Sequence, residues 1–138
     1  MINPDLTLGH LNTTSKGTIV EHLGIEYTEV TTEYLCAKMP VDHRTIQPFG
    51  ILHGGASVVL AETLGSVSAV YSVDETKSAV GLDINANHIR PVKNGWVYGK
   101  AEPLHLGKGT QIWSIKIVNE ENKLVCVARL TVAILDKK

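Results

Sequence analysis

Residues 53–71 constrain the fold more than any other part of the chain, because they have the pattern of a long helix with almost no charged surface. Apolar residues recur at helical spacing, and alanine, serine and glycine fill most other positions. Glu62 is the only permanently charged residue between Arg44 and Asp74. A helix without a polar face is expected to be buried. The rest of the chain must therefore supply the surface that covers it.

The segments around this helix alternate apolar and polar residues, which predicts strands. Short polar or glycine-containing links join the last four strands, so they are expected to pair as antiparallel neighbours. We predict an α+β fold for the single domain 1–138, an antiparallel β-sheet wrapped around one long central α-helix. The expected strands are 25–30, 33–41, 79–90, 96–104, 111–118 and 124–135, and two short helices are expected at 7–12 and 18–23.

Composition argues against several classes of partner. The net charge is −1 and no basic run occurs, so neither nucleic acid nor an anionic membrane is an expected partner. The low-charge stretch 45–73 holds Pro48, glycines and Glu62 and is not expected to span a membrane. The first residues lack the pattern of a secretory signal. Cys36 and Cys126 lie in apolar strands, so free thiols and a cytoplasmic location are expected.

Glu62 is the first candidate for chemistry. A carboxylate in the middle of a buried helix is costly to ionise, so its pKa should rise. Ser66 lies one turn later on the same face and could hydrogen-bond the carboxylate. Such a group can serve as a nucleophile or a general base. The competing interpretation is a glutamate that reaches solvent or pairs with a distant lysine or arginine.

The start of the helix is the second candidate, with the sequence Gln-Pro-Phe-Gly-Ile-Leu-His-Gly-Gly over residues 47–55. Gly54 and Gly55 allow close backbone approach and leave first-turn N–H groups free. Those groups and the helix dipole favour an oxyanion, as acyl transfer requires. Alternatively, the glycines serve only the turn.

The separation of these two candidates has a consequence for assembly. Gly54 and Glu62 are eight residues apart, about 12 Å along one helix. One reacting carbon cannot contact both. If they act together, Glu62 must come from a second subunit whose helix runs antiparallel, which implies at least a symmetric dimer.

The segment from Gln47 to Ser66 resembles the hotdog-fold thioesterases of the phenylacetate and 4-hydroxybenzoyl-CoA type. The resemblance extends over nearly the whole chain and is strongest to the dihydroxynaphthoyl-CoA branch, which acts in menaquinone biosynthesis, and to the enterobactin-proofreading branch. It implies hydrolysis of an acyl-CoA, with an aromatic acyl group favoured. Glu62 would be nucleophile or base, Gly54 or Gly55 would polarise the carbonyl, His53 would shape the turn, and Gln47 would orient the carbonyl. Ser66 would hold Glu62 or its water.

The same resemblance implies a path for coenzyme A, which is part of the substrate, so no separate cofactor is expected. The residues along it would be Gly81, His88, Ile89, Arg90, Pro91, His105, Leu106, Gly107, Lys108, Gly109 and Thr110. Arg90, Lys108 and the histidines are suitable partners for phosphates. An ordinary strand end and a flexible hairpin would give the same pattern. None of the six histidines has metal-ligand spacing, so no metal is expected.

Two other functions remain open. A hydratase or dehydratase of the same fold pairs a histidine with an acid, and His53 with Glu62 could serve in that way. A non-catalytic acyl-CoA-binding protein is the other alternative, but the chain leaves no room for an output module. The resemblance favours a homotetramer built from dimers.

Overall fold

All six strands that the alternating pattern predicts are present in the computed structural model, which describes residues 1–138. They form one sheet in which every hydrogen-bonded pair of neighbours is antiparallel, in the order β1-β2-β4-β5-β6-β3. The bounds differ from the predicted ones by at most two residues at either end. The strands are β1 (Glu26–Val30), β2 (Leu35–Pro40), β3 (Lys77–His88), β4 (Trp96–Leu106), β5 (Thr110–Val118) and β6 (Leu124–Asp136).

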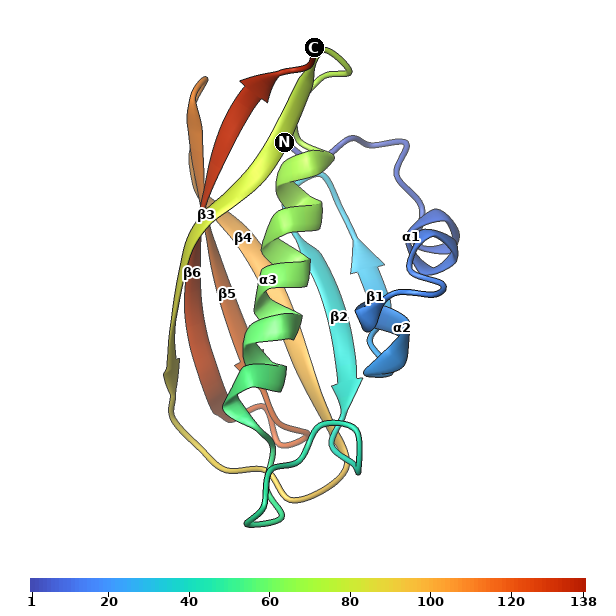
Figure 1. The fold of residues 1–138 in the computed structure, drawn as a ribbon, viewed down its shortest axis with the longest axis vertical. Coiled ribbons are helices and arrows are strands. Elements are labelled where there is room, and N and C mark those ends of the chain that lie inside the picture. The colour runs from blue at the N-terminus through green and yellow to red at the C-terminus, as the bar shows by residue number, and fades with distance from the viewer.

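The helix α3 (Gly54–Val70) lies across the concave face of this curved sheet (Figure 1). Its inward side chains, Leu60, Ala61 and Leu64, are fully buried against inward residues of the strands. Contact is so close that a Cβ added at Gly99 would lie 2.6 Å from the Leu64 Cδ1 atom. Only glycine fits that position, and it lets β4 pass directly beneath the helix.

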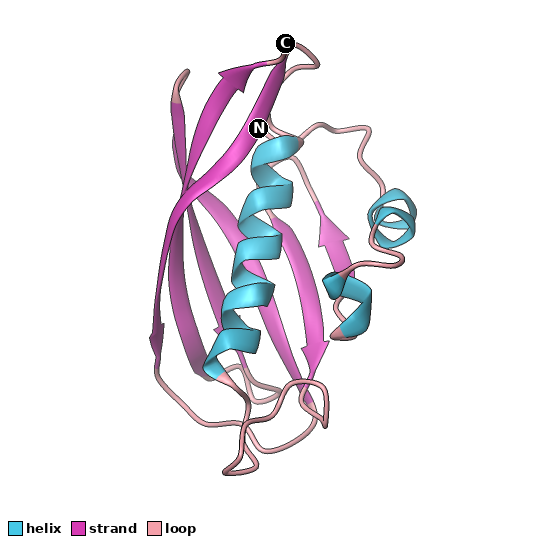
Figure 2. Ribbon diagram, in the orientation of Figure 1, coloured by secondary structure: helices cyan, strands magenta, loops and turns pink.

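The expectation that α3 is buried on all sides is wrong for the single protomer. Val58, Val59 and Glu62 are only partly covered, and Val70 is 44% exposed. The sheet covers the opposite side of the helix, and the N-terminal helices cover only part of the remainder (Figure 2). One mostly apolar strip of the helix is therefore only partly covered within the chain.

Strand β3 is a free edge of the sheet, because it pairs only with β6. Its apolar residues Val80 and Leu82 are 48% and 63% exposed. The helix α3 contacts the same strand. A free edge next to a partly uncovered apolar helix surface is typical of a surface that another chain covers.

The two short helices also form as predicted. They are α1 (Leu8–Thr14) and α2 (Ile19–His22), and they begin after the cap residues Thr7 and Thr18. The side chain of His10 hydrogen-bonds the hydroxyl group of Tyr71 at 3.0 Å, which ties α1 to the end of α3. None of the helices is long and apolar enough to cross a membrane.

Candidate active site

The N-terminus of α3 presents one free backbone donor. His53 is the cap residue, and its Nδ1 atom accepts the Gly55 N–H at 2.7 Å. Ala56 and Ser57 both donate to the carbonyl of His53. The N–H of Gly54 has no protein acceptor. Of the two predicted donors, it is therefore the one that is free to bind a ligand. The hydrogen bond from Gly55 to His53 lies within the turn that the resemblance assigned to His53.

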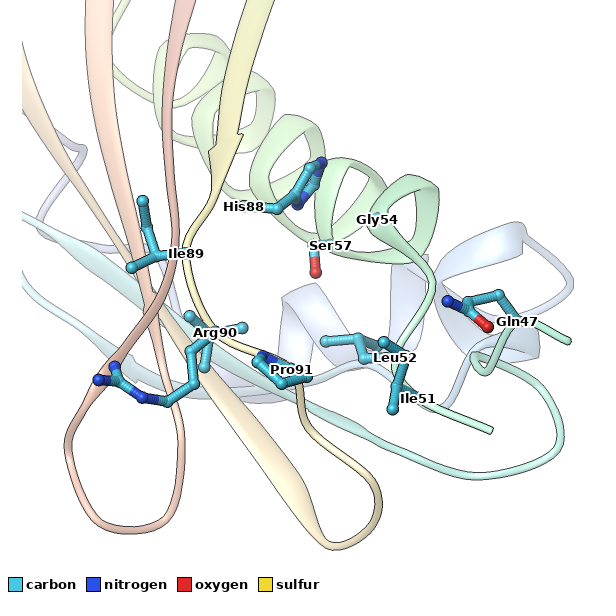
Figure 3. Close-up of a pocket in the computed structure, with 10 residues that line it drawn as sticks. Gln47, Ile51, Leu52, Gly54, Ser57, His88, Ile89, Arg90 and Pro91 are labelled. Atoms are coloured by element: carbon cyan, nitrogen blue, oxygen red, sulfur yellow. The ribbon is translucent and has the colours of Figure 1, made fainter. Parts of the chain in front are cut away.

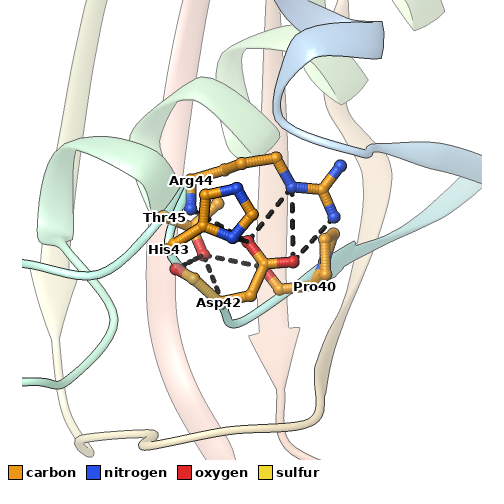
Figure 4. Close-up of polar contacts among 5 residues, drawn as sticks. All are labelled: Pro40, Asp42, His43, Arg44 and Thr45. Atoms are coloured by element: carbon orange, nitrogen blue, oxygen red, sulfur yellow. Dashed lines mark hydrogen bonds and ion pairs between the residues drawn. The ribbon is translucent and has the colours of Figure 1, made fainter.

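A hydrogen-bonded loop places Gln47 beside this helix start. At its beginning Asp42 pairs with Arg44 at 2.7 Å, and the Thr45 hydroxyl donates to the Pro40 carbonyl at 2.7 Å (Figure 4). The hydrogen bonds from Arg44 hold the pKa of Asp42 at about 2, well below its ordinary value. The Asp42 carboxylate therefore stays ionised, and its ion pair with Arg44 is kept, across the physiological pH range.

Beyond this anchor the loop narrows into a tight turn. Ile46 bridges Leu52, and Gly50 has a positive φ of 80°. The Oε1 atom of Gln47 accepts the N–H of Phe49, so the side-chain amide nitrogen is left to donate to a ligand. The carbonyl-orienting role predicted for Gln47 needs such a donor.

A cleft of about 480 Å³ opens between this loop, the start of α3 and the end of β3. Its lining includes Gln47, Gly54, His88 and Arg90, and Figure 3 shows them around one opening. The ring of His88 lies so close to Gly54 that an added Cβ would meet its Nε2 atom at 2.8 Å. Residues 47–55 and 88–91, which are far apart in sequence, thus line one cleft.

Glu62 lies in a different cleft, of about 370 Å³, between α3 and the N-terminal helices. Burial raises the pKa of the Glu62 carboxyl above its ordinary value of 4.5, in the predicted direction. No salt bridge to Lys, Arg or His neutralises it. Ser66 lines the same cleft, but the hydrogen bond predicted between its hydroxyl and the carboxylate is not formed in the protomer.

Gly81, predicted on the coenzyme A path, contacts Glu62. A Cβ added there would lie 2.7 Å from the Glu62 Oε1 atom. The lack of a side chain on this residue of β3 therefore makes room for the carboxylate. A β-bulge follows directly, where the pairing with β6 shifts between Gly81 and Asp83.

The remaining predicted coenzyme A residues, 105–110, form the hairpin between β4 and β5. They lie near the C-terminal end of α3, where Leu106, Gly107 and Lys108 line a cleft of about 530 Å³. The cleft that Gln47 and Arg90 line is at the other end of the helix, because Gly54 and Ser57 of the first turns also line it. Within one protomer the structure does not bring the two predicted parts of the path together.

The wall of the Glu62 cleft contains residues that the sequence patterns did not indicate. Leu11, Ser15 and Thr18 come from the N-terminal helical segment, Tyr27 from β1, and Tyr71 from the end of α3. Only Tyr71 is near Glu62 in sequence, so no local motif could have predicted this wall. No group of three or more His, Cys, Asp or Glu side chains is arranged to hold a metal ion.

Comparison with known proteins identifies the family to which the chain belongs. The model of the thioesterase superfamily matches residues 49–126, which include Gly54, Glu62 and His88. The chain belongs to this superfamily, and its fold is the hotdog fold that the resemblance implied. It is a thioester hydrolase.

Individual relatives agree with this classification. The proofreading thioesterase EntH of Cronobacter turicensis is 51% identical over 94% of this chain and 95% of its own length. The crystal structure of a thioesterase from Haemophilus influenzae has a TM-score of 0.94 and 50% identity, covering 99% of this chain and 96% of that one.

A thioesterase of Staphylococcus aureus, 40% identical, has been solved as two single-alanine variants. One structure has a TM-score of 0.83 and covers 86% of this chain and 99% of that one, and the other has a TM-score of 0.81 and covers 84% and 97%. One variant replaces a glutamate and the other a glutamine. These two positions have the same separation along the chain as Gln47 and Glu62 here.

Proposed function

We propose that this protein hydrolyses acyl-CoA thioesters, with Glu62 as the nucleophile or general base. One observation carries the proposal. Glu62 is the only charged residue of α3, it lies in a cleft, and no cation neutralises it. A purely structural role would leave the cost of burying this charge without compensation.

The proposed site spans two subunits related by a twofold axis. If the α3 helices of two protomers lie antiparallel, Gly54 of each faces Glu62 of the other, and each reaction uses one from each chain. The partly covered strip of α3 and the free edge of β3 supply the apolar surface and unpaired backbone groups that such an interface needs. A homotetramer would then consist of two such dimers.

The remaining groups have complementary roles around the thioester. The free N–H of Gly54, at the positive end of the helix dipole, would donate to the carbonyl oxygen as negative charge develops there. The amide nitrogen of Gln47 would orient the same carbonyl. Ser66 would contact the carboxylate or its water once substrate is bound. His53 would keep the turn in place.

The reaction can follow either of two balanced routes. In one, a Glu62 oxygen attacks the thioester carbon, the carbon–sulfur bond breaks with protonation of the thiolate, and water hydrolyses the resulting anhydride. In the other, Glu62 takes a proton from water, and the hydroxide adds to the carbon before the same bond breaks. Both routes release the free acid and coenzyme A and restore the carboxylate.

Coenzyme A would lie across the subunit boundary. The twofold axis that would bring Gly54 to Glu62 would also bring the 105–110 hairpin of one subunit toward the 88–91 segment of the other. Arg90 donates one N–H to the Leu124 carbonyl at 2.7 Å, and its remaining N–H groups are available for a phosphate. Lys108 is exposed on the hairpin. In such a dimer the two predicted parts of the coenzyme A path, which lie apart within one protomer, would be adjacent.

The acyl group would enter the Glu62 cleft, where two tyrosine rings and apolar side chains favour an aromatic group. The matching glutamine–glutamate spacing in the Staphylococcus aureus relative supports the roles of Gln47 and Glu62. The similarity to proofreading thioesterases supports hydrolysis of a thioester. A role in menaquinone biosynthesis or in proofreading would use the same hydrolysis.

The experiment that tests the proposal measures release of free thiol from benzoyl-CoA and other acyl-CoAs. Glu62→Gln removes the base but keeps the shape, so kcat should fall by roughly two to four decades while the fold persists. Glu75→Gln, an exposed glutamate outside both clefts, is the matched control and should keep full activity. A folded Glu62→Gln protein whose kcat is within about threefold of wild type, well under one decade, would refute the mechanism. Loss of water from a 3-hydroxyacyl-CoA would instead indicate a hydratase.

A further inference from the structure

Gly81 is the only glycine of β3, and its position in the strand faces α3. It pairs with Val132, whose side chain is buried in the core, and residues paired across two strands point to the same face of the sheet. The neighbouring inward positions of β3 hold Ala79 and Ile84, which pack against the core. The β-bulge that follows Gly81 is a feature frequent next to active sites, where it changes the direction of a side chain.

The space in front of Gly81 is filled by the Glu62 carboxylate. A Cβ added at Gly81 would lie 2.7 Å from the Glu62 Oε1 atom, whereas the nearest atom outside Glu62, Leu130 Cδ1, would be 3.8 Å away. The carboxylate therefore lies where a side chain of the strand would begin. No protein donor hydrogen-bonds this carboxylate, and burial is the only influence that shifts its pKa. Packing therefore sets its position.

Leu130 links this contact to the spacing between the helix and the sheet. Its side chain is fully buried, and a Cβ added at Gly65 would meet the Leu130 Cδ2 atom at 2.7 Å. Gly65 follows Glu62 by three residues, so the two lie on one face of α3. The absence of a side chain at Gly65 lets α3 approach the sheet closely. At that short separation, the absence of a side chain at Gly81 leaves room for Glu62.

Gly81 lies apart from the other residues predicted on the coenzyme A path. Residues 88–91 line the cleft with Gln47, and residues 106–108 line the cleft at the other end of α3, but Gly81 lines neither. We propose that Gly81 is a positioning residue, which holds the Glu62 carboxylate in place for reaction with the thioester and does not contact coenzyme A. This inference rests on the proposed function, because it takes Glu62 as the catalytic group.

The effect of a larger residue follows from the 2.7 Å distance. A Cβ cannot approach an oxygen atom so closely, and the atom that moves at least cost is the flexible end of the Glu62 side chain. The fold should therefore tolerate Gly81→Ala, while the carboxylate is displaced. Misplacement of a reacting group by about 1 Å can lower the rate by about a hundredfold. We expect kcat to fall by roughly tenfold to a hundredfold, with KM nearly unchanged.

The test is a double-mutant cycle of Gly81→Ala and Glu62→Asp, with kcat and KM measured by thiol release from the best acyl-CoA. Glu62→Asp keeps the carboxylate but withdraws it from Gly81 by one methylene. Gly81→Ala should slow the wild type by roughly tenfold or more, yet change kcat of Glu62→Asp by less than about twofold, because the added methyl enters vacated space. The control Gly9→Ala, whose added Cβ meets nothing within 4 Å, should leave both backgrounds unchanged.

Several outcomes would overturn the inference. Gly81→Ala could keep kcat within about twofold of wild type, it could raise KM alone, as a coenzyme A contact would, or it could slow both backgrounds equally, as a structural role would. Thermal melts check the fold, and a loss of folding that Glu62→Asp does not relieve would show that the crowding does not involve the carboxylate. Failure of the proposed function looks different, because wild type would then release no thiol from any acyl-CoA or Glu62→Gln would remain active.

Discussion

Mixing two inactive variants tests whether the active site is shared between subunits. Gln47 and Gly54 line one cleft, whereas Glu62 lines another. Gly54 and Glu62 are separated by about 12 Å along the axis of α3, while a hydrogen-bonded contact spans only about 3 Å. If the site is shared, Gln47→Ala and Glu62→Gln damage the same site from opposite subunits.

The expected recovery follows from counting sites. In a mixed dimer, one site carries both substitutions and the other carries neither, so one of two sites is intact. Random assortment of equal amounts makes about half of the dimers mixed, and activity should return to about a quarter of wild type. Pairing of dimers into tetramers does not change this average.

The assay is thiol release from the best acyl-CoA, measured on each variant alone, on wild type, and on the two variants refolded or co-expressed together. Each variant alone should show only a small residual activity. Mixtures of Glu62→Gln with wild type should show only the mean of their components. Activity of the two-variant mixture no greater than the mean of its parents would refute the shared site, because every protomer would then carry its own defect.

Three further predictions follow from individual residues. Because burial raises the pKa of Glu62, kcat/KM should fall as pH decreases through a value above 4.5, and a midpoint at or below 4.5 would contradict this. Arg90→Ala should raise KM for acyl-CoA more than it lowers kcat, since phosphate contacts are nearly equal in ground and transition states; steady-state kinetics with an unchanged KM would exclude Arg90 from the path. Ser68 is fully buried and its hydroxyl has no partner, so Ser68→Ala should raise the free energy of unfolding by roughly 1 kcal/mol. Ser72→Ala, which removes a hydroxyl that donates to the Ser68 carbonyl at 2.6 Å, should lower it, and urea unfolding of both variants would show whether the signs differ.

The raised pKa of Glu62 also has a consequence for stability. A carboxyl group that is harder to ionise when folded binds more protons in the native state, so stability falls as pH rises from its unfolded pKa through its folded pKa. Glu62→Gln removes this penalty. The variant should therefore be more stable than wild type at neutral pH, and the advantage should disappear below about pH 4.

Most secondary structure could be predicted from sequence because its signals are local. The alternation of Trp113, Ile115 and Ile117 gives β5 with these three side chains fully buried. Thr7 and Thr18 cap the two short helices, whose positions the sequence predicted. The isolated charge of Glu62 and the glycines at 54–55 also indicated the candidate site, since their context is a single helix.

The tertiary structure decided which of these residues meet. The chain passes from β2 through α3 to the far edge of the sheet, so β3 pairs with β6 and not with β2. This order brings His88 to Gly54 and Gly81 to Glu62, and it leaves the 105–110 hairpin at the opposite end from Arg90. No local pattern encodes these contacts, because strand order depends on the packing of segments far apart in sequence.

The burial of α3 also has one part that the sequence determines and another that only the tertiary structure decides. Its near lack of charge follows from the sequence alone, and it predicted a helix buried on all sides. Which surface covers it does not follow, because an apolar residue is stabilised equally by its own sheet or by another subunit. The structure shows the sheet covering one side and leaves a strip only partly covered. Likewise Tyr27 reaches the Glu62 cleft only because β1 and α1 pack beside α3, a contact that depends on the assembled fold.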